Sequence, residues 1–113
     1  MRNGFDTLLQ VVQNDFGYDL SFSLEDATGA ALDISGASLS FNAQSDGDYA
    51  VKFDNPMIMV NASQGLCKYT VQSTDFVLSG AWSVQIVVTF LTGEMLTFTG
   101  ITVQVDPALP LSQ

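Results

Sequence analysis

The sequence predicts a single all-β domain, built as an antiparallel β-sandwich. Along most of the chain, apolar and polar residues alternate with a period of two, which is typical of strands with one buried face. Gly, Asp, Asn and Ser recur between these stretches, as expected for turns. The apolar fraction of the 113 residues is 47% and includes eight Phe, three Tyr and one Trp, residue types that suit a pleated, half-buried surface.

The first part of the domain contains two clear strands. One covers residues 18–25 and the other residues 37–43, with a turn at 26–30 and a short apolar segment at 31–34 between them. In both strands every second side chain is apolar, so those side chains are expected on the core face. The predicted core residues of this part are Tyr18, Leu20, Phe22, Leu24, Leu39 and Phe41.

Three shorter strands follow in the middle of the chain. After the turn residues 45–48, alternation predicts a strand at 49–53 that stops at Asp54-Asn55-Pro56. Residues 57–61 form a further short strand, and the turn at 63–65 leads into a strand at 67–71 with Tyr69 in the core. Residues 73–76 are expected to form one helical turn or a tight corner.

The last part of the domain holds the clearest strand, residues 82–90, followed by a hairpin loop at 91–94. Residues 95–99 pair back across this loop, and Gly100 is expected to mark a bulge or bend before the strand at 101–105. Trp82 is the predicted centre of the core. The other core residues of this part are Val84, Ile86, Val88 and Val103.

The two ends of the chain are set apart from the domain, which spans residues 17–106. Residues 1–16 are interpreted as an N-terminal arm or, alternatively, as the first strand of the sandwich, and residues 107–113 as an extended tail whose prolines keep it out of a sheet. Because exposed apolar stretches often mark interaction surfaces, partner contacts are predicted at the ends. The residues concerned are Phe5, Leu8, Leu9, Val11, Val12, Leu109 and Leu111.

The charge of the chain argues against nucleic-acid and membrane partners. Twelve acidic residues outnumber Arg2, Lys52 and Lys68, and the net charge is -9. Such a chain lacks the basic cluster that binds phosphates and is repelled by anionic lipid. Cys67 is the single cysteine, so no intrachain disulfide can form; alternation places it in the core.

No catalytic apparatus, cofactor site or metal site is predicted. The chain has no His, and neither Gly-rich phosphate-binding motif occurs. The adjacent carboxylates Glu25 and Asp26, and the pair Asp46 and Asp48, are interpreted as solvated turn residues. Calcium binding by Asp46, Asp48 and Asp54 is the alternative, although their spacing matches no EF-hand.

The order of motifs over residues 17–106 resembles the immunoglobulin-like domain of the N-terminal region of tailed-phage baseplate upper proteins. The quoted stretches are YDLSFSLED at 18–26, LDISGA at 32–37, GLCKY at 65–69, GAW at 80–82 and ITVQV at 101–105. The chain departs from that family because it lacks the long C-terminal extension, and because Trp82 stands where Tyr is commoner.

The resemblance implies an immunoglobulin-like antiparallel β-sandwich and a non-enzymatic structural role in a tailed-phage virion, as a baseplate, tail, neck, fibre-attachment or capsid-decoration protein. It further implies other virion proteins as partners, homo-oligomerisation, synthesis in the host cytoplasm and location in the virion. The alternative function is that of a surface adhesin or carbohydrate-binding β-sandwich module. Tyr49 or Phe53 near Asn55 could serve such a module, but strand alternation more simply places both rings in the core.

Overall fold

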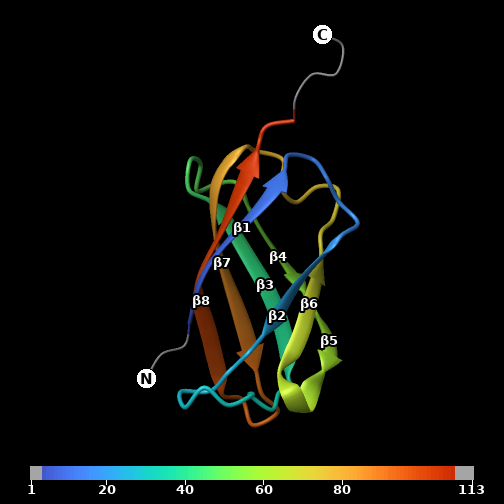
Figure 1. Cartoon of the computed structure of the whole chain (residues 1–113), viewed down its shortest axis with the longest axis vertical. Coiled ribbons are helices and arrows are strands. Elements are labelled where there is room, and N and C mark those ends of the chain that lie inside the picture. The colour runs from blue at the N-terminus through green and yellow to red at the C-terminus, as the bar shows by residue number, and fades with distance from the viewer. Residues whose placement is uncertain (1–3, 109–113) are drawn as a thin grey trace.

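The computed structural model describes the backbone of residues 4–108 and the side chains of residues 7–108. The described residues form eight strands and one short 3-10 turn (Figure 1). The strands are β1 (Gly4–Val12), β2 (Asp19–Ser23), β3 (Ser38–Ser45), β4 (Lys52–Pro56), β5 (Ile58–Asn61), β6 (Leu66–Thr70), β7 (Gly80–Thr89) and β8 (Met95–Asp106), and the turn is η1 (Ala62–Gln64).

The strands make two sheets. The larger sheet has five strands in the order β1-β8-β7-β3-β4, and the smaller has three in the order β2-β6-β5. All neighbouring strands are antiparallel except β1 and β8, which run in the same direction side by side (Figure 1). The prediction of a wholly antiparallel sandwich is therefore wrong for this one pair. Residues 4–12 form the first strand of the larger sheet and not an arm, and this strand runs parallel to β8.

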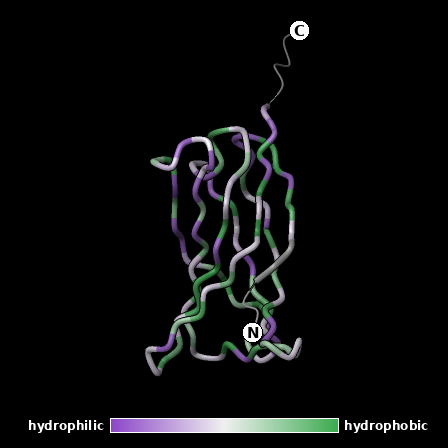
Figure 2. The backbone as a smooth tube through the Cα atoms, turned by 90° about the vertical axis from the view of Figure 1, so that its left-hand side faces the viewer, coloured by the Kyte–Doolittle hydropathy of each residue, from purple (hydrophilic) through white to green (hydrophobic). Residues whose placement is uncertain are grey.

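The core lies between the two sheets and is rich in aromatic rings. Hydrophobic and hydrophilic residues alternate along the strands (Figure 2), so each strand turns one face inward. Trp82 is fully buried, and its indole Nε1 donates a hydrogen bond to the carbonyl oxygen of Leu78 at 3.0 Å. Phe41 and Tyr69, from opposite sheets, stack with ring centroids 4.3 Å apart.

The residues predicted for the core are buried with one exception. Tyr18 is only partly buried, since it stands just before β2, although it packs against the core. The buried members are Leu20, Phe22, Leu24, Leu39, Phe41, Tyr69, Trp82, Val84, Ile86, Val88 and Val103.

The chain changes sheets between β4 and β5. β4 pairs with β3 in the larger sheet, and after Met57 the chain continues as β5, which pairs with β6 in the smaller sheet. The predicted stop at residues 54–56 is wrong: β4 runs through Pro56, because an edge strand needs no N–H on its open side. Tyr49 lies in the preceding turn and is 68% exposed.

Residues 95–106 form a single strand with a bulge, which confirms the bulge predicted at Gly100. The pairing of β7 with β8 shifts register between Val84 and Ile86, which face Ile101 and Phe98. Gly100 has φ of 84°, a left-handed conformation that glycine adopts without strain. The bulge lets the long strand bend while both halves keep their apolar residues inward.

A polar corner is buried beneath the chain between β6 and β7. Asp75 is 2% exposed, and its carboxylate accepts hydrogen bonds from the hydroxyl of Tyr69 and from the backbone N–H of Gln72. The side-chain amide of Asn55 donates to the Tyr69 hydroxyl at 2.8 Å. Burial, followed by the bond to Asp75, raises the pKa of Tyr69 well above its ordinary value, so the phenol stays protonated over the physiological range.

Candidate interaction surfaces

Two of the three carboxylates considered for calcium, Asp46 and Asp48, accept hydrogen bonds from other residues. Asp46 accepts a hydrogen bond from the Ser83 hydroxyl at 2.7 Å, and Asp48 accepts one from the backbone N–H of Ala50 at 3.1 Å. Within residues 7–108, no group of three or more Asp, Glu, Cys or His side chains comes together in a way that could hold a metal ion. Asp48 therefore makes the turn contact that Asp commonly makes, Asp46 is bonded to β7, and the side chain of Asp54 has no hydrogen-bond partner among the described residues.

Cys67 is enclosed in the core. Its side chain is 1% exposed, and desolvation raises the pKa of the thiol to about 11. Because the thiolate is the reactive form, this cysteine is shielded both sterically and by its protonation state. Its position agrees with a structural role.

The N-terminal residues predicted to contact partners alternate along β1. Leu8 and Val12 point outward and are 63% and 41% exposed, whereas Val11 is buried and Leu9 is half-buried against the core. The structure thus divides the predicted set into an outer pair and an inner pair. The side chain of Phe5 and the residues Leu109 and Leu111 lie outside the described part of the chain.

Among the strands that the structure describes, β1 has a partner on one side only. It is the end strand of the larger sheet, with β8 beside it. Its register with β8 is regular from Thr7 to Val12, after a shift between Gly4 and Thr7. Residues 7–13 read TLLQVVQ and carry no charge. The part of the open edge that follows Asp6 therefore has none of the charged or proline residues that normally discourage strand addition.

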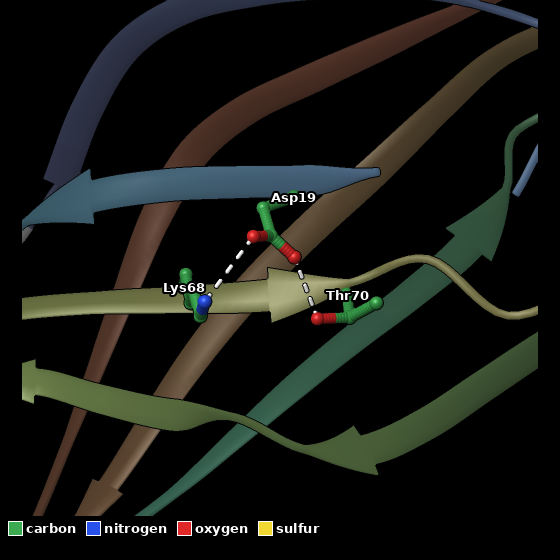
Figure 3. Close-up of polar contacts among 3 residues, drawn as sticks. All are labelled: Asp19, Lys68 and Thr70. Carbon is green, nitrogen blue, oxygen red and sulfur yellow. Dashed lines mark hydrogen bonds and ion pairs between the residues drawn. The ribbon is translucent and has the colours of Figure 1, made fainter. Parts of the chain in front are cut away.

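β2, an edge of the smaller sheet, is built differently. Asp19 projects from it and receives two contacts from β6 (Figure 3): the Lys68 ammonium at 3.2 Å and the Thr70 hydroxyl at 2.6 Å. The hydrogen bond from Thr70, and then the contact with Lys68, lower the pKa of the Asp19 carboxyl. The carboxylate therefore remains ionised on this edge, where it opposes pairing with another strand.

The two remaining edges carry other obstacles. β4 presents Lys52 and Asp54 and ends at Pro56. β5 exposes Ile58 and Val60, but it has only four residues and its register with β6 shifts between Met59 and Asn61. Bulges, short length and proline all disfavour edge-to-edge pairing, which leaves residues 7–12 of β1 as the longest regular and uncharged stretch of edge in the described fold.

A second surface lies on the outer face of the larger sheet. There an open depression of about 490 Å³ is bordered by side chains from β3, β4 and β7: Asn42, Gln44, Lys52, Asp54, Ser83 and Gln85. Asn42 stands between Asp54 and Gln85 in the sheet register, and Gln44 stands between Lys52 and Ser83. The depression therefore presents amides, a hydroxyl, one cation and one carboxylate side by side.

Several of these groups are free to bind. Among the residues the structure describes, the side chains of Lys52, Asp54 and Gln85 have no hydrogen-bond or ion-pair partner. Sequence reasoning missed this surface. The polar residues were recognisable as outward-facing, but only the register of three strands brings residues 42, 54 and 85 into one row.

Comparison with known proteins gives no match to any family model and no significant match to a curated protein. In the part of the chain that the structure describes, no helix is long and apolar enough to cross a membrane. The assignment of function therefore depends on the surfaces described above and on the ordered motifs of the sequence.

Proposed function

We propose that this protein is a non-enzymatic structural component of a tailed-phage virion, with an immunoglobulin-like β-sandwich that docks onto other virion proteins. The ordered motifs over residues 17–106 support the family, and the two-sheet architecture is compatible with it. A docking role is favoured over catalysis because the chain has no His and its single thiol is enclosed in the core.

The observation that carries the docking role is the open edge of β1. Exposed backbone groups on such an edge can be satisfied by a strand from a neighbouring protein. The outward side chains Leu8 and Val12 add apolar contact area beside that backbone. A protein that docks by strand addition needs an open strand edge and no catalytic residues, and a β-sandwich can provide that edge.

The proposal is tested in phage particles. Particles released from cells that carry the gene are purified by density, and an antibody against the purified chain is used for immunogold labelling. Labelling at a fixed place on the particles, together with terminase and tail genes on either side of this gene, supports the proposal. Particles without the chain, or a gene flanked by secretion or glycosidase genes, contradict it.

A carbohydrate-binding role is the second candidate, and the depression on the larger sheet favours it. Amides, hydroxyls and a carboxylate provide the directed hydrogen bonds by which proteins hold neutral sugars in concave sites. Tyr49, exposed at one end of β3, lies next to Gln44, whose amide donates to the Tyr49 carbonyl oxygen at 3.0 Å. Tyr49 therefore supplies an exposed aromatic residue near the depression, and aromatic rings pack against sugar faces.

This second candidate has a direct test. Neutral hexasaccharides of glucose, galactose and N-acetylglucosamine are titrated into labelled protein, and amide chemical shifts are followed. Shifts grouped around Asn42, Asp54 and Gln85, and lost in the Gln85→Ala variant, support glycan binding. A Ser21→Ala variant, on the other sheet, serves as the control and is expected to bind normally. Unchanged spectra with all three sugars contradict the candidate.

A further inference from the structure

We infer that the β1 edge pairs with β1 of a second copy of this chain, in an antiparallel arrangement centred on Gln10. The two five-stranded sheets then join into one continuous sheet across a two-fold axis. This pairing is isologous, so the same surface of both copies is used and the contact closes on itself. The inference uses the same open edge of β1 that carries the docking role, and it names a second copy of this chain as the strand that occupies this edge.

The pattern of β1 is self-complementary when the strand is reversed. Residues 7–13 read Thr-Leu-Leu-Gln-Val-Val-Gln, which is polar, apolar, apolar, polar, apolar, apolar, polar in either direction. With Gln10 on the axis, Leu8 faces Val12 of the second copy and Leu9 faces Val11. Every apolar side chain therefore meets an apolar one, and directly opposed pairs are the contacts that stabilise antiparallel strands.

The two faces of the strand agree with this register. On the outer face, Leu8 and Val12 are 63% and 41% exposed, and each would be covered by the other in the paired state. Gln10 is exposed between them, and its amide, which has both donor and acceptor groups, can bond to the same amide of the second copy. On the inner face, the half-buried Leu9 extends the core toward the axis.

The charge distribution permits this contact although the chain carries a net charge of -9. Residues 7–13 contain no ionisable side chain, and the nearest acids in sequence, Asp6 and Asp15, lie beyond the paired segment. Repulsion between two copies is therefore a long-range effect that salt screens, with a Debye length of about 10 Å at 0.1 M. We expect pairing to strengthen as the salt concentration rises.

The other edges of the sandwich do not satisfy these conditions. If two copies of β2 paired antiparallel with Ser21 on the axis, Asp19 of each copy would lie opposite Ser23 of the other. This would place two carboxylates at the interface, each already bonded to Lys68 and Thr70 of its own copy. β5 is short and irregular. A strand-to-strand contact covers a small area compared with the roughly 1,600 Å² of a standard interface, so the dimer is expected to be weak, with dissociation in the micromolar to millimolar range.

Disulfide trapping tests both the pairing and its register. Cys67 is enclosed, so Gln10→Cys adds the only accessible thiol among the described residues, and the two-fold axis brings two of these thiols face to face at a separation that a disulfide can span. With copper–phenanthroline as oxidant, we expect Gln10→Cys to form covalent dimers at least tenfold faster than Gln85→Cys. The control position is also exposed but lies on β7, the central strand of the larger sheet.

A second variant fixes the register. Leu8→Cys faces Val12 on the axis-related strand, so it should cross-link with itself far more slowly than Gln10→Cys, whereas a mixture of Leu8→Cys and Val12→Cys should form mixed dimers readily. Equal rates for Gln10→Cys and Gln85→Cys, or faster self-linking of Leu8→Cys, would overturn the inference. Either result leaves the virion proposal untouched, since labelling of particles does not depend on self-pairing.

Discussion

β1 and β2 are both edge strands, one on each sheet, and they present opposite chemistry to water. The outward residues of β2 are Asp19, Ser21 and Ser23, and the first of these is a carboxylate fixed by two contacts from β6. Among the described side chains of β1, those that face outward are Leu8, Gln10 and Val12. The difference indicates that one edge is protected against strand addition and the other is left competent for it.

The same comparison separates stability from association. Folding free energy is expected to come from the buried rings and the polar corner, which lie away from β1, whereas the outward side chains of β1 contribute mainly when a second strand covers them. Substitutions in the core should therefore unfold the protein, and substitutions on the outer face of β1 should leave it folded.

The largest effect is expected for Trp82→Ala. Trp82 is fully buried, contacts Phe76 edge-on with ring centroids 5.2 Å apart, and stands opposite Ser45, the last residue of β3. Removal of such a ring costs about 3–5 kcal/mol of unfolding free energy. Equilibrium denaturation by urea measures this loss, and an unchanged midpoint would show that the ring does not hold the core together.

Asp75→Ala is expected to have the next largest effect. The substitution leaves the buried Tyr69 hydroxyl and the Gln72 N–H without their shared acceptor, at a cost of about 2–4 kcal/mol. Asp54→Ala, on the exposed face of β4, is the matched control and should change stability by less than about 0.5 kcal/mol. Equal losses for the two variants would contradict the importance given to the buried corner.

Gln10→Lys should change association while it leaves stability almost unaltered. Two like charges would face each other on the two-fold axis, which destabilises directly opposed strand pairs; the exposed lysine should alter unfolding free energy by less than about 0.5 kcal/mol. Gln85→Lys changes the net charge equally and should still self-associate. Sedimentation equilibrium measures the association of both variants, and urea denaturation measures their stability. Loss of association in both variants would indicate that net charge, and not the β1 edge, controls association.

The smallest effect concerns the protected edge. Thr70→Val removes the hydroxyl that donates to Asp19, so the pKa of Asp19 should rise toward its ordinary value. Because this pKa is lowered in the folded state, the contact stabilises the fold above the unfolded pKa and is lost as the pH falls through the folded pKa. NMR titration of the carboxyl carbon measures the shift; an unchanged pKa would mean that Lys68 alone is responsible.

Much of the fold could be predicted because alternation reports burial directly. The strands around Phe22, Phe41 and Ile86 have strict period-two patterns, and their inward residues are buried. β1 was ambiguous because Leu8-Leu9 and Val11-Val12 are adjacent apolar pairs, which do not distinguish an inner from an outer face. The end of β4 was misplaced because its polar residues resemble a turn, although an edge strand tolerates them.

Less of the candidate surfaces could be predicted, since they depend on pairing. The sequence indicates that the β1 segment is apolar, yet only the parallel pairing with β8 shows that one backbone side stays open. Likewise, the pairing of β3 with β4 and of β3 with β7 is needed to bring three polar residues into one row, namely Asn42, Asp54 and Gln85. Long-range register is set by the packing of the entire domain and leaves little local trace.

The most direct test of the open β1 edge is sedimentation equilibrium of the unaltered protein at about 10 µM to 1 mM, in low and in high salt. We predict a weight-average mass that rises with concentration from 12.1 kDa toward twice that value, and that rises further at high salt because screening weakens the repulsion between two acidic chains. A mass that stays at 12.1 kDa at every concentration and salt level would contradict the account.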